Sequence, residues 1–460
     1  MRTIETLFTV ALAIGCAALP IGASAQTAIN IYALQGLVPV TVLLGTPAGQ
    51  AALAANYAVT AAIQTGTSNQ PGLQPFEQQQ QQALKDAFIT SANATELADG
   101  LGTKLGGAYQ TASSYTSADD GKTSTSTDIS PSVATLIGYA FALTSADAAS
   151  GKFFFANETV VTKTGATPVS NDAADILTKA GGTTDVFGKA YKHPAGSPGA
   201  DPYGNSRPFQ TESNVVKYTG LDYFGVASAN DAYLNGPTQM LVSSPSFPSG
   251  HTTYGYTESL LLAMLLPERF PQMIVRGAEY GNSRIVLGAH YAMDVIAGRT
   301  LAAYDIAHLL ADNPTYLGQR FGQFSVADFA VALGAARTDL TTVLASGCGN
   351  AVPACANEDG SRFRNAAANE AFYESTQTYG LPVVYQATAH GVEDVAAIAP
   401  EAGYILTTAY PQLTLAQADT ILTQTEGPGG GFLDNGSPFG LYSRLDLYRA
   451  GLRAASRATR

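Results

Sequence analysis

Apolar residues recur with a helical period along much of this 460-residue chain. Between residue 26 and about residue 108, apolar residues lie three and four positions apart, which predicts helices. The pattern is clear in two segments, GQAALAANYAVTAAIQTG and FEQQQQQALKDAFITSANATELADGLGTKLGGAY. The pattern returns in SVATLIGYAFALTSADAASG and over about 249–266 and 271–311, with a break near Gly288. The chain is therefore predicted to be mainly α.

Polar and irregular stretches separate these segments. Residues 110–131 are small and polar and are predicted to form an exposed loop, and residues 190–213 are rich in Pro, Gly, Asp and Asn. Beyond about residue 360 the pattern predicts short helices with loops, the last loop carrying GPGGG. No Gly-Lys-Ser/Thr follows GPGGG, so it is not a phosphate-binding P-loop.

Composition and charge narrow the class of protein. Apolar residues make up 46% of the chain and charged residues 13%, which is typical of a globular protein. The formal net charge is −12, so the chain lacks the basic surface that nucleic acids and anionic membranes attract. We therefore expect no nucleic-acid partner, and any phosphate site must be local.

The N-terminus is typical of a secretory signal. A positive end at Met1-Arg2 precedes the apolar LFTVALAIGCAALPIGA, and Ala23-Ser24-Ala25 fits a cleavage site before Gln26. The alternative, a membrane anchor, is disfavoured because the apolar stretch is short and broken by Pro20. We expect removal of residues 1–25, a single domain over residues 26–460, no stable membrane insertion, and a periplasmic or secreted protein.

Two cysteines, Cys348 and Cys355, stand close together in CGNAVPAC. In an oxidising compartment such a pair is most simply a disulfide that closes a small loop. A metal site is the weaker interpretation, because no second pair of ligands accompanies them.

Three short motifs carry candidate chemistry. In Pro248-Ser249-Gly250-His251, directly before an apolar helix, Ser249 suits a cap, and Gly250 lets the backbone approach a ligand. The N–H groups of such a helix start attract anions, and His251 is placed to act on the group attached to the anion.

The second motif is NSRIVLGAHYAMD. His290 and Asp294 are four positions apart, which on a helix puts them on one face, so that the carboxylate holds one ring nitrogen and the other is free to act as nucleophile or base. Arg284, six residues before His290, offers a guanidinium to phosphate oxygens. The third motif is Arg207-Pro208, whose arginine is biased towards extended backbone.

Each motif alone is usually structural, but their ordered combination is not common. Together they resemble the three-part signature of the type 2 phosphatidic acid phosphatase (PAP2) superfamily, which includes class A nonspecific acid phosphatases and vanadium-dependent haloperoxidases. The motif core spans about residues 185–300. The resemblance implies a helical bundle of this type with long irregular loops, extra N-terminal helices and a C-terminal extension.

One position departs from the signature. The family has a lysine seven residues before the Arg-Pro arginine, where this chain has Ala200. Upstream, Lys189 and Lys192 lie in KAYKHP, followed by an insertion rich in Pro, Gly and Asp. We expect Lys189 to fill the role, with Lys192 as the second choice.

The resemblance also implies roles. The phosphate of a small phosphomonoester would be bound by Lys189, Arg207, Arg284, Ser249 and Gly250. His290, oriented by Asp294, would attack phosphorus, and His251 would act as acid and then as base. No metal or other cofactor is expected.

Two alternatives stay open at this point. In a haloperoxidase the same pocket would hold vanadate as cofactor, with His290 as its ligand; in a phosphatase vanadate would be an inhibitor. A scaffold or binding protein with a catalytically weakened site would release no phosphate.

Overall fold

The computed structural model describes residues 36–38, 40–88, 92–117, 124–157, 159–162, 165–168, 206–212, 214–231 and 246–458, together with Ala33 and Leu241. These residues form a mainly helical fold, as the sequence predicts. The signal at residues 1–25, as well as Lys189 and Lys192, lies outside the described residues. The expected single domain over residues 26–460 stays a prediction.

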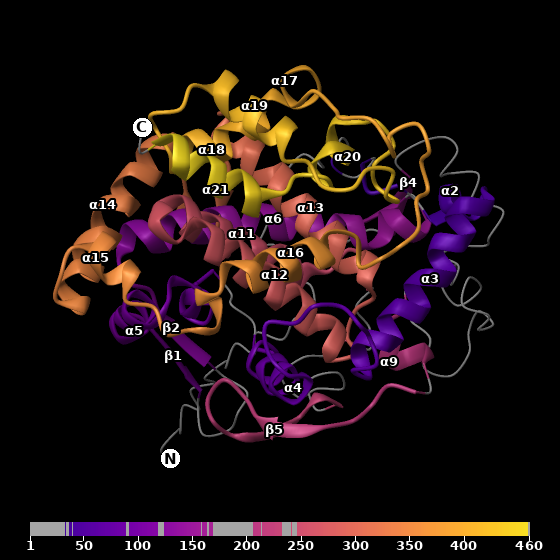
Figure 1. Cartoon of the computed structure of the whole chain (residues 1–460), viewed down its shortest axis with the longest axis horizontal. Coiled ribbons are helices and arrows are strands. Elements are labelled where there is room, and N and C mark those ends of the chain that lie inside the picture. Colours follow the sequence, from indigo (N-terminus) through magenta and orange to yellow (C-terminus); the bar gives the residue numbers. More distant parts are fainter. Residues whose placement is uncertain are drawn as a thin grey trace, which may run out of the picture.

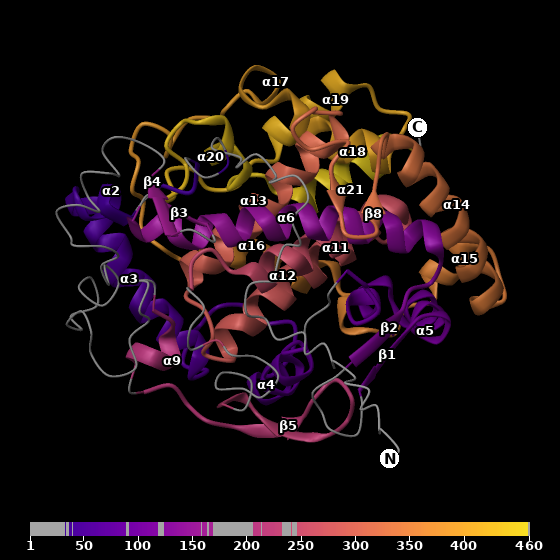
Figure 2. The same cartoon turned by 180° about the vertical axis from the view of Figure 1, so that it is seen from behind.

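Four helices form the centre of the fold (Figures 1 and 2). They are α6 (Pro131–Asn157), α11 (Gly250–Leu265), α12 (Phe270–Val286) and α13 (Ala292–Leu310). α11 packs against each of the other three. Nearly every residue of α11 and α13 is buried, which explains why both are rich in apolar residues around their whole circumference.

The predicted N-terminal helices are confirmed in the described part of that segment. They are α2 (Val40–Leu44), α3 (Pro47–Gln64), α4 (Phe76–Lys85), the 3₁₀ helix η1 (Leu97–Leu101) and α5 (Thr103–Ala112). α3 begins where Thr46 Oγ1 accepts the N–H of Gly49 at 3.0 Å, while Pro47 occupies the first helical position. α3 and α4 contact α12 and so border the motif region.

The prediction of a loop over residues 110–131 is wrong in part. β1 (Ser114–Ser117) and β2 (Ser124–Thr127) pair as an antiparallel hairpin. Tyr115 explains the difference, because its ring is buried against Phe88 and Tyr223, and this burial stabilises a strand of otherwise small polar residues.

Three further two-stranded antiparallel pairs are described: β3 (Thr159–Thr162) with β4 (Gly165–Pro168), β5 (Thr219–Leu221) with β6 (Ala227–Ala229), and β7 (Arg320–Phe321) with β8 (Phe324–Ser325).

The C-terminal region contains the predicted short helices and loops, and covers one side of the central helices (Figure 1). It comprises α14 (Phe329–Cys348), α15 (Val352–Asn357), η4 (Arg362–Arg364), α16 (Ala366–Thr378), α17 (Val395–Ile398), η5 (Pro400–Ala402), α18 (Gly403–Ala409), α19 (Leu415–Gln424), α20 (Pro438–Tyr442) and α21 (Leu447–Ala458). The predicted disulfide is confirmed: Cys348 and Cys355 are bonded and join the end of α14 to α15.

Among the described residues, one segment meets the length and hydropathy of a membrane span. It is Pro131–Ala149, within α6, with a mean hydropathy of 1.2 over its most apolar window. Half of that window is buried inside the fold, and a core helix meets the same criteria. The segment is therefore weak evidence for a membrane.

Candidate active site

The Pro248–His251 motif leads into α11. Ser249 is the N-cap residue, and its Oγ accepts the N–H of Thr252 at 3.2 Å. The N–H of Ser249 donates to the backbone oxygen of Asp294 at 3.0 Å. Gly250 and His251 are the first two residues of α11. The N–H groups in the first turn of a helix have no backbone acceptor within that helix. The N–H groups of these two residues are the part of the motif best placed to meet an anion.

The motif that contains His290 and Asp294 lies at a helix break, which corrects one prediction. His290 and Asp294 do not share a helix, because α12 ends at Val286 and α13 begins at Ala292. Gly288 adopts a positive φ of 80°, a conformation that suits glycine and reverses the chain. Asp294 still reaches His290, since its carboxylate turns back over the first turn of α13.

The His290 ring is held from both sides. Its Nδ1 lies 3.2 Å from Oδ2 of Asp294, and the same oxygen accepts the N–H of Tyr291 at 2.8 Å and the hydroxyl of Ser246 at 2.5 Å. Its Nε2 lies 2.9 Å from Nη1 of Arg207. A carboxylate on Nδ1 favours the tautomer with its proton there, which leaves the lone pair on Nε2.

Arg207 comes from a different part of the chain. It caps α9 (Pro208–Thr211) with extended backbone, as its place before proline predicts. Its buried side chain also donates through Nη1 to the backbone oxygen of Ala289 at 3.0 Å. The guanidinium is therefore fixed directly beside the nitrogen of His290 that carries the lone pair.

Arg284, in the last turn of α12, is buried and fixed by its neighbours. Its Nη2 donates to the backbone oxygen of Asp86, and its guanidinium carbon lies 4.9 Å from the ring centroid of Tyr280. Ser283 Oγ donates to the Asp86 carboxylate at 2.7 Å. Asp86 thus positions Ser283 and Arg284, two consecutive residues of the motif that also contains His290, a role that sequence reasoning missed.

His251 stands close to His290, with their ring centroids 6.3 Å apart. Its Nε2 is buried and has no hydrogen-bond partner among the described atoms. Burial first, and then the charges of Arg284 and Arg207, hold its pKa well below its usual range. The lowered pKa favours the neutral form of His251, whose Nε2 is placed to meet a ligand.

Burial also dominates the electrostatics of the His290–Asp294 pair. Burial first, and then Arg207, lowers the pKa of His290 well below its usual range. Burial raises the pKa of Asp294 to about 6, although hydrogen bonds from Ser246 and Tyr291 oppose the shift. Both shifts favour the neutral forms of groups that water does not reach.

The starts of α11 and α13 meet backbone to backbone. A Cβ added at Gly298 would lie 2.6 Å from the carbonyl oxygen of Ser249, so the close approach requires glycine. Together with the bond from Ser249 N–H to the oxygen of Asp294, this contact joins the motif of His251 to that of His290.

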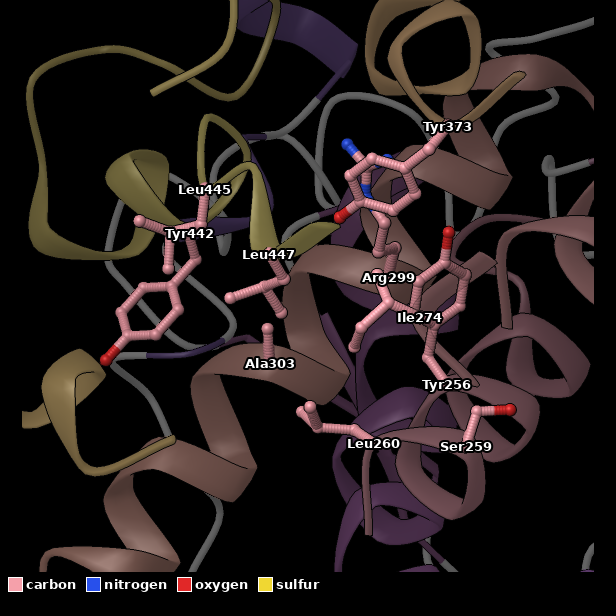
Figure 3. A pocket seen from close by; sticks show the side chains of 10 residues that line it. All are labelled: Tyr256, Ser259, Leu260, Ile274, Arg299, Ala303, Tyr373, Tyr442, Leu445 and Leu447. Atoms are coloured by element: carbon pink, nitrogen blue, oxygen red, sulfur yellow. The ribbon is translucent and has the colours of Figure 1, made fainter. Parts of the chain in front are cut away.

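A cavity further along α11 is separate from this constellation (Figure 3). Its lining includes Tyr256 and Ser259 of α11, Arg299 of α13 and Tyr373 of α16. Its volume of about 10 Å³ suits about one water molecule rather than a substrate.

The predicted residues thus divide into two groups. Five side chains gather at one place, from the N-cap of α9, from α11, α12 and α13, and from the link between α12 and α13: Arg207, His251, Arg284, His290 and Asp294. Ser249 and Gly250 adjoin them. The hydroxyl of Ser249 already accepts the N–H of Thr252, and the N–H of Ser249 already donates to the backbone oxygen of Asp294. Lys189, the expected lysine, falls outside the described residues.

Comparison with known proteins agrees with this geometry. Residues 201–314 match the family described as the PAP2 superfamily. The chain carries a PAP2 superfamily domain. Every described residue of the constellation lies inside the matched region, and Lys189 lies before it.

The PAP2 domain also has distant homologues among nonspecific acid phosphatases. An acid phosphatase of Zymomonas mobilis is 48% identical over 67 residues, which cover 15% of this chain and 25% of that protein. A non-specific acid phosphatase of Providencia stuartii is 28% identical over 158 residues, covering 32% and 62%. One from Salmonella typhi is 34% identical over 110 residues, covering 21% and 43%. The matched part of the chain therefore covers only between a quarter and about three fifths of the length of each of these relatives.

Proposed function

We propose that this protein is an exported phosphomonoester hydrolase that works through a phosphohistidine at His290. The observation that carries the proposal is the position of His290 between Asp294 and Arg207. The carboxylate directs the lone pair to Nε2, and the guanidinium lies where it can bind an oxygen of the phosphoryl group that Nε2 attacks. The acid phosphatases that match parts of the chain support the same reaction class.

In the first step, Nε2 of His290 attacks phosphorus while the ester P–O bond breaks. Arg207, Arg284 and the N–H groups that head α11 stabilise the charge on the equatorial oxygens. His251 donates a proton to the leaving oxygen. The proton arrives with the substrate, because the monoester's second pKa is about 6 and binding an anion raises the pKa of the buried histidine.

In the second step, water attacks the phosphohistidine and the P–N bond breaks. His251, now neutral, takes a proton from that water, and inorganic phosphate leaves. Asp294 stabilises the positive charge that forms on the His290 ring in the first step. The cationic side chains of the pocket carry the charge stabilisation throughout, so none of these steps requires a metal ion.

Export fits the bonded cysteines. A disulfide persists in an oxidising compartment, which supports the proposed periplasmic or secreted location. The substrate class is a small phosphate monoester, because the pocket's anion-binding groups are few and lie close together.

The test is hydrolysis of p-nitrophenyl phosphate by wild type and His290→Ala. We expect the variant to lose at least roughly 10³-fold in kcat, since it lacks the nucleophile. We expect orthovanadate to inhibit the wild type and EDTA not to. Mass spectrometry of the quenched reaction should find phosphate on His290.

Two results would contradict the proposal. Turnover that survives in His290→Ala, or that EDTA abolishes, would rule out a metal-free phosphohistidine. Halide oxidation by peroxide with added vanadate, without ester hydrolysis, would identify the site as a haloperoxidase instead.

A further inference from the structure

α6 reaches the candidate site from outside the PAP2 match. A Cβ added at Gly151 would lie 3.2 Å from Cδ of Pro248 and 2.6 Å from Cδ1 of Leu37, so the α6 backbone packs directly on the Pro248–His251 motif. The C-terminal part of α6 is therefore next to the residues that begin α11.

The next residue on α6 is Lys152, which is half-buried. Its Cε, the carbon that bears the ammonium group, lies 3.9 Å from the position that a Cβ of Gly250 would take. Gly250 provides one of the two N–H groups that head α11. The lysine cation is thus held at the same helix start that attracts an anion.

The charge of Lys152 also reaches the reacting groups. It lowers the pKa of His251, of His290 and of Asp294, in each case after larger effects led by burial. A single ammonium group that acts on all three side chains lies near each of them. A surface lysine screened by water would not have this reach.

We propose that Lys152 of α6 is a phosphate ligand of this site and binds the substrate's phosphoryl group together with Arg207 and Arg284. The inference rests on the proposed function for the identity of the substrate. It reassigns the phosphate-binding lysine, which the sequence places at Lys189, to a helix that precedes the PAP2 match by about fifty residues. An ammonium group there would add a third cation to a dianionic ligand without any metal.

The test measures binding of inorganic phosphate and orthovanadate to the mature protein by calorimetry. Lys152→Met removes the charge and keeps the length of the side chain, and we expect it to weaken phosphate binding by about ten- to a hundredfold. Lys152→Arg restores the charge and should recover most of the affinity. Lys104→Met, at an exposed ion pair with Glu358, is the matched control and should bind as the wild type does.

A second readout separates ligand binding from a purely structural role. Without the Lys152 charge the pKa of His290 rises, so the acid limb of kcat/KM against pH should move to higher pH in Lys152→Met. A loss of packing alone would leave the limb in place. Among the described residues, the charged and titratable groups that act on His290 are Asp294 of α13, Arg207 before α9, His251 of α11, Arg284 of α12 and Lys152 of α6.

The outcomes discriminate between the hypotheses. Wild-type phosphate affinity in Lys152→Met, with a loss in Lys189→Met, would overturn the assignment and support the lysine expected from sequence. If phosphate binding depends on Lys152 but the wild type hydrolyses no ester, Lys152 is a phosphate ligand and the proposed function is refuted. A wild type that binds neither phosphate nor vanadate would refute both.

Discussion

At the scale of the residue, His290 shows how burial prepares a side chain for acid conditions. Its Nδ1 faces Asp294, its Nε2 faces Arg207, and no part of its side chain is exposed. A histidine whose pKa is depressed stays neutral, and therefore nucleophilic, in buffers that would protonate an ordinary one.

This arrangement makes a prediction about pH. The acid limb of kcat/KM should lie below about pH 6.5, because the lone pair of His290 is lost only as the pH falls through its depressed pKa. Arg207→Met removes the largest of the charges that lower this pKa and should move the limb upwards. Steady-state kinetics across pH would measure both, with Arg320→Met on an exposed strand as control. A limb at or above pH 6.5 in the wild type would contradict the argument.

Sequence reasoning identifies the residues that lie in recognisable motifs and misses those that do not. His251, His290 and Asp294 are found because short spacing ties their chemistry to a helix start. Ser246 and Asp86 stand in no such pattern and reach the site only through tertiary packing. Nothing local in the sequence distinguishes such residues from other polar ones.

At the scale of the element, a buried ion pair fixes α4 to α12. Asp86, at the end of α4, accepts hydrogen bonds from Arg276 at 2.7 and 3.1 Å and from Ser283. Burial alone would raise the pKa of Asp86, but Arg276 and the hydrogen bonds lower it to about 2. The carboxylate is therefore charged at every pH at which the enzyme is expected to work.

We expect Asp86→Ala to lower the free energy of unfolding by about 3 kcal/mol, because it leaves a buried guanidinium short of one partner. Urea denaturation would measure the change. Asp328→Ala, which removes an exposed cap of α14, should cost only about 1 kcal/mol and sets the scale. Equal losses in the two variants would mean that the buried pair contributes no more than a cap.

The boundaries of elements show where local pattern is sufficient. The break at Gly288 is predictable, because a glycine interrupts an apolar helix. The placement of His290 outside α13 is not, since it depends on the Asp294 carboxylate capping the new helix. The β1–β2 hairpin cannot be predicted from local sequence for a similar reason, because its stability comes from Tyr115 packing against rings distant in the sequence.

At the scale of the whole molecule, the disulfide ties α15 to the end of the outer helix α14. It closes a loop with a sequence separation of seven residues, and α14 in turn packs on α5 and α6. Closing a loop of this size restricts the unfolded chain and is worth about 2.5 kcal/mol.

The double variant Cys348→Ser/Cys355→Ser should lose about that amount of stability and keep the proposed phosphatase activity at room temperature, because α14 and α15, which the bond joins, carry none of the candidate site residues. Thermal unfolding with and without reductant would measure it. The wild type should lose stability in reductant and the variant should not. A variant as stable as the oxidised wild type would show that the loop contributes nothing.

The contact between Gly298 and Ser249 has a consequence for how such a site diverges. This contact between peptide groups helps to fix the separation of His251, the proposed proton donor, and His290, the proposed nucleophile. The surrounding side chains are then free to change with the alcohol portion of the ester. One reaction geometry can in this way serve many leaving groups, provided that position 298 keeps no side chain.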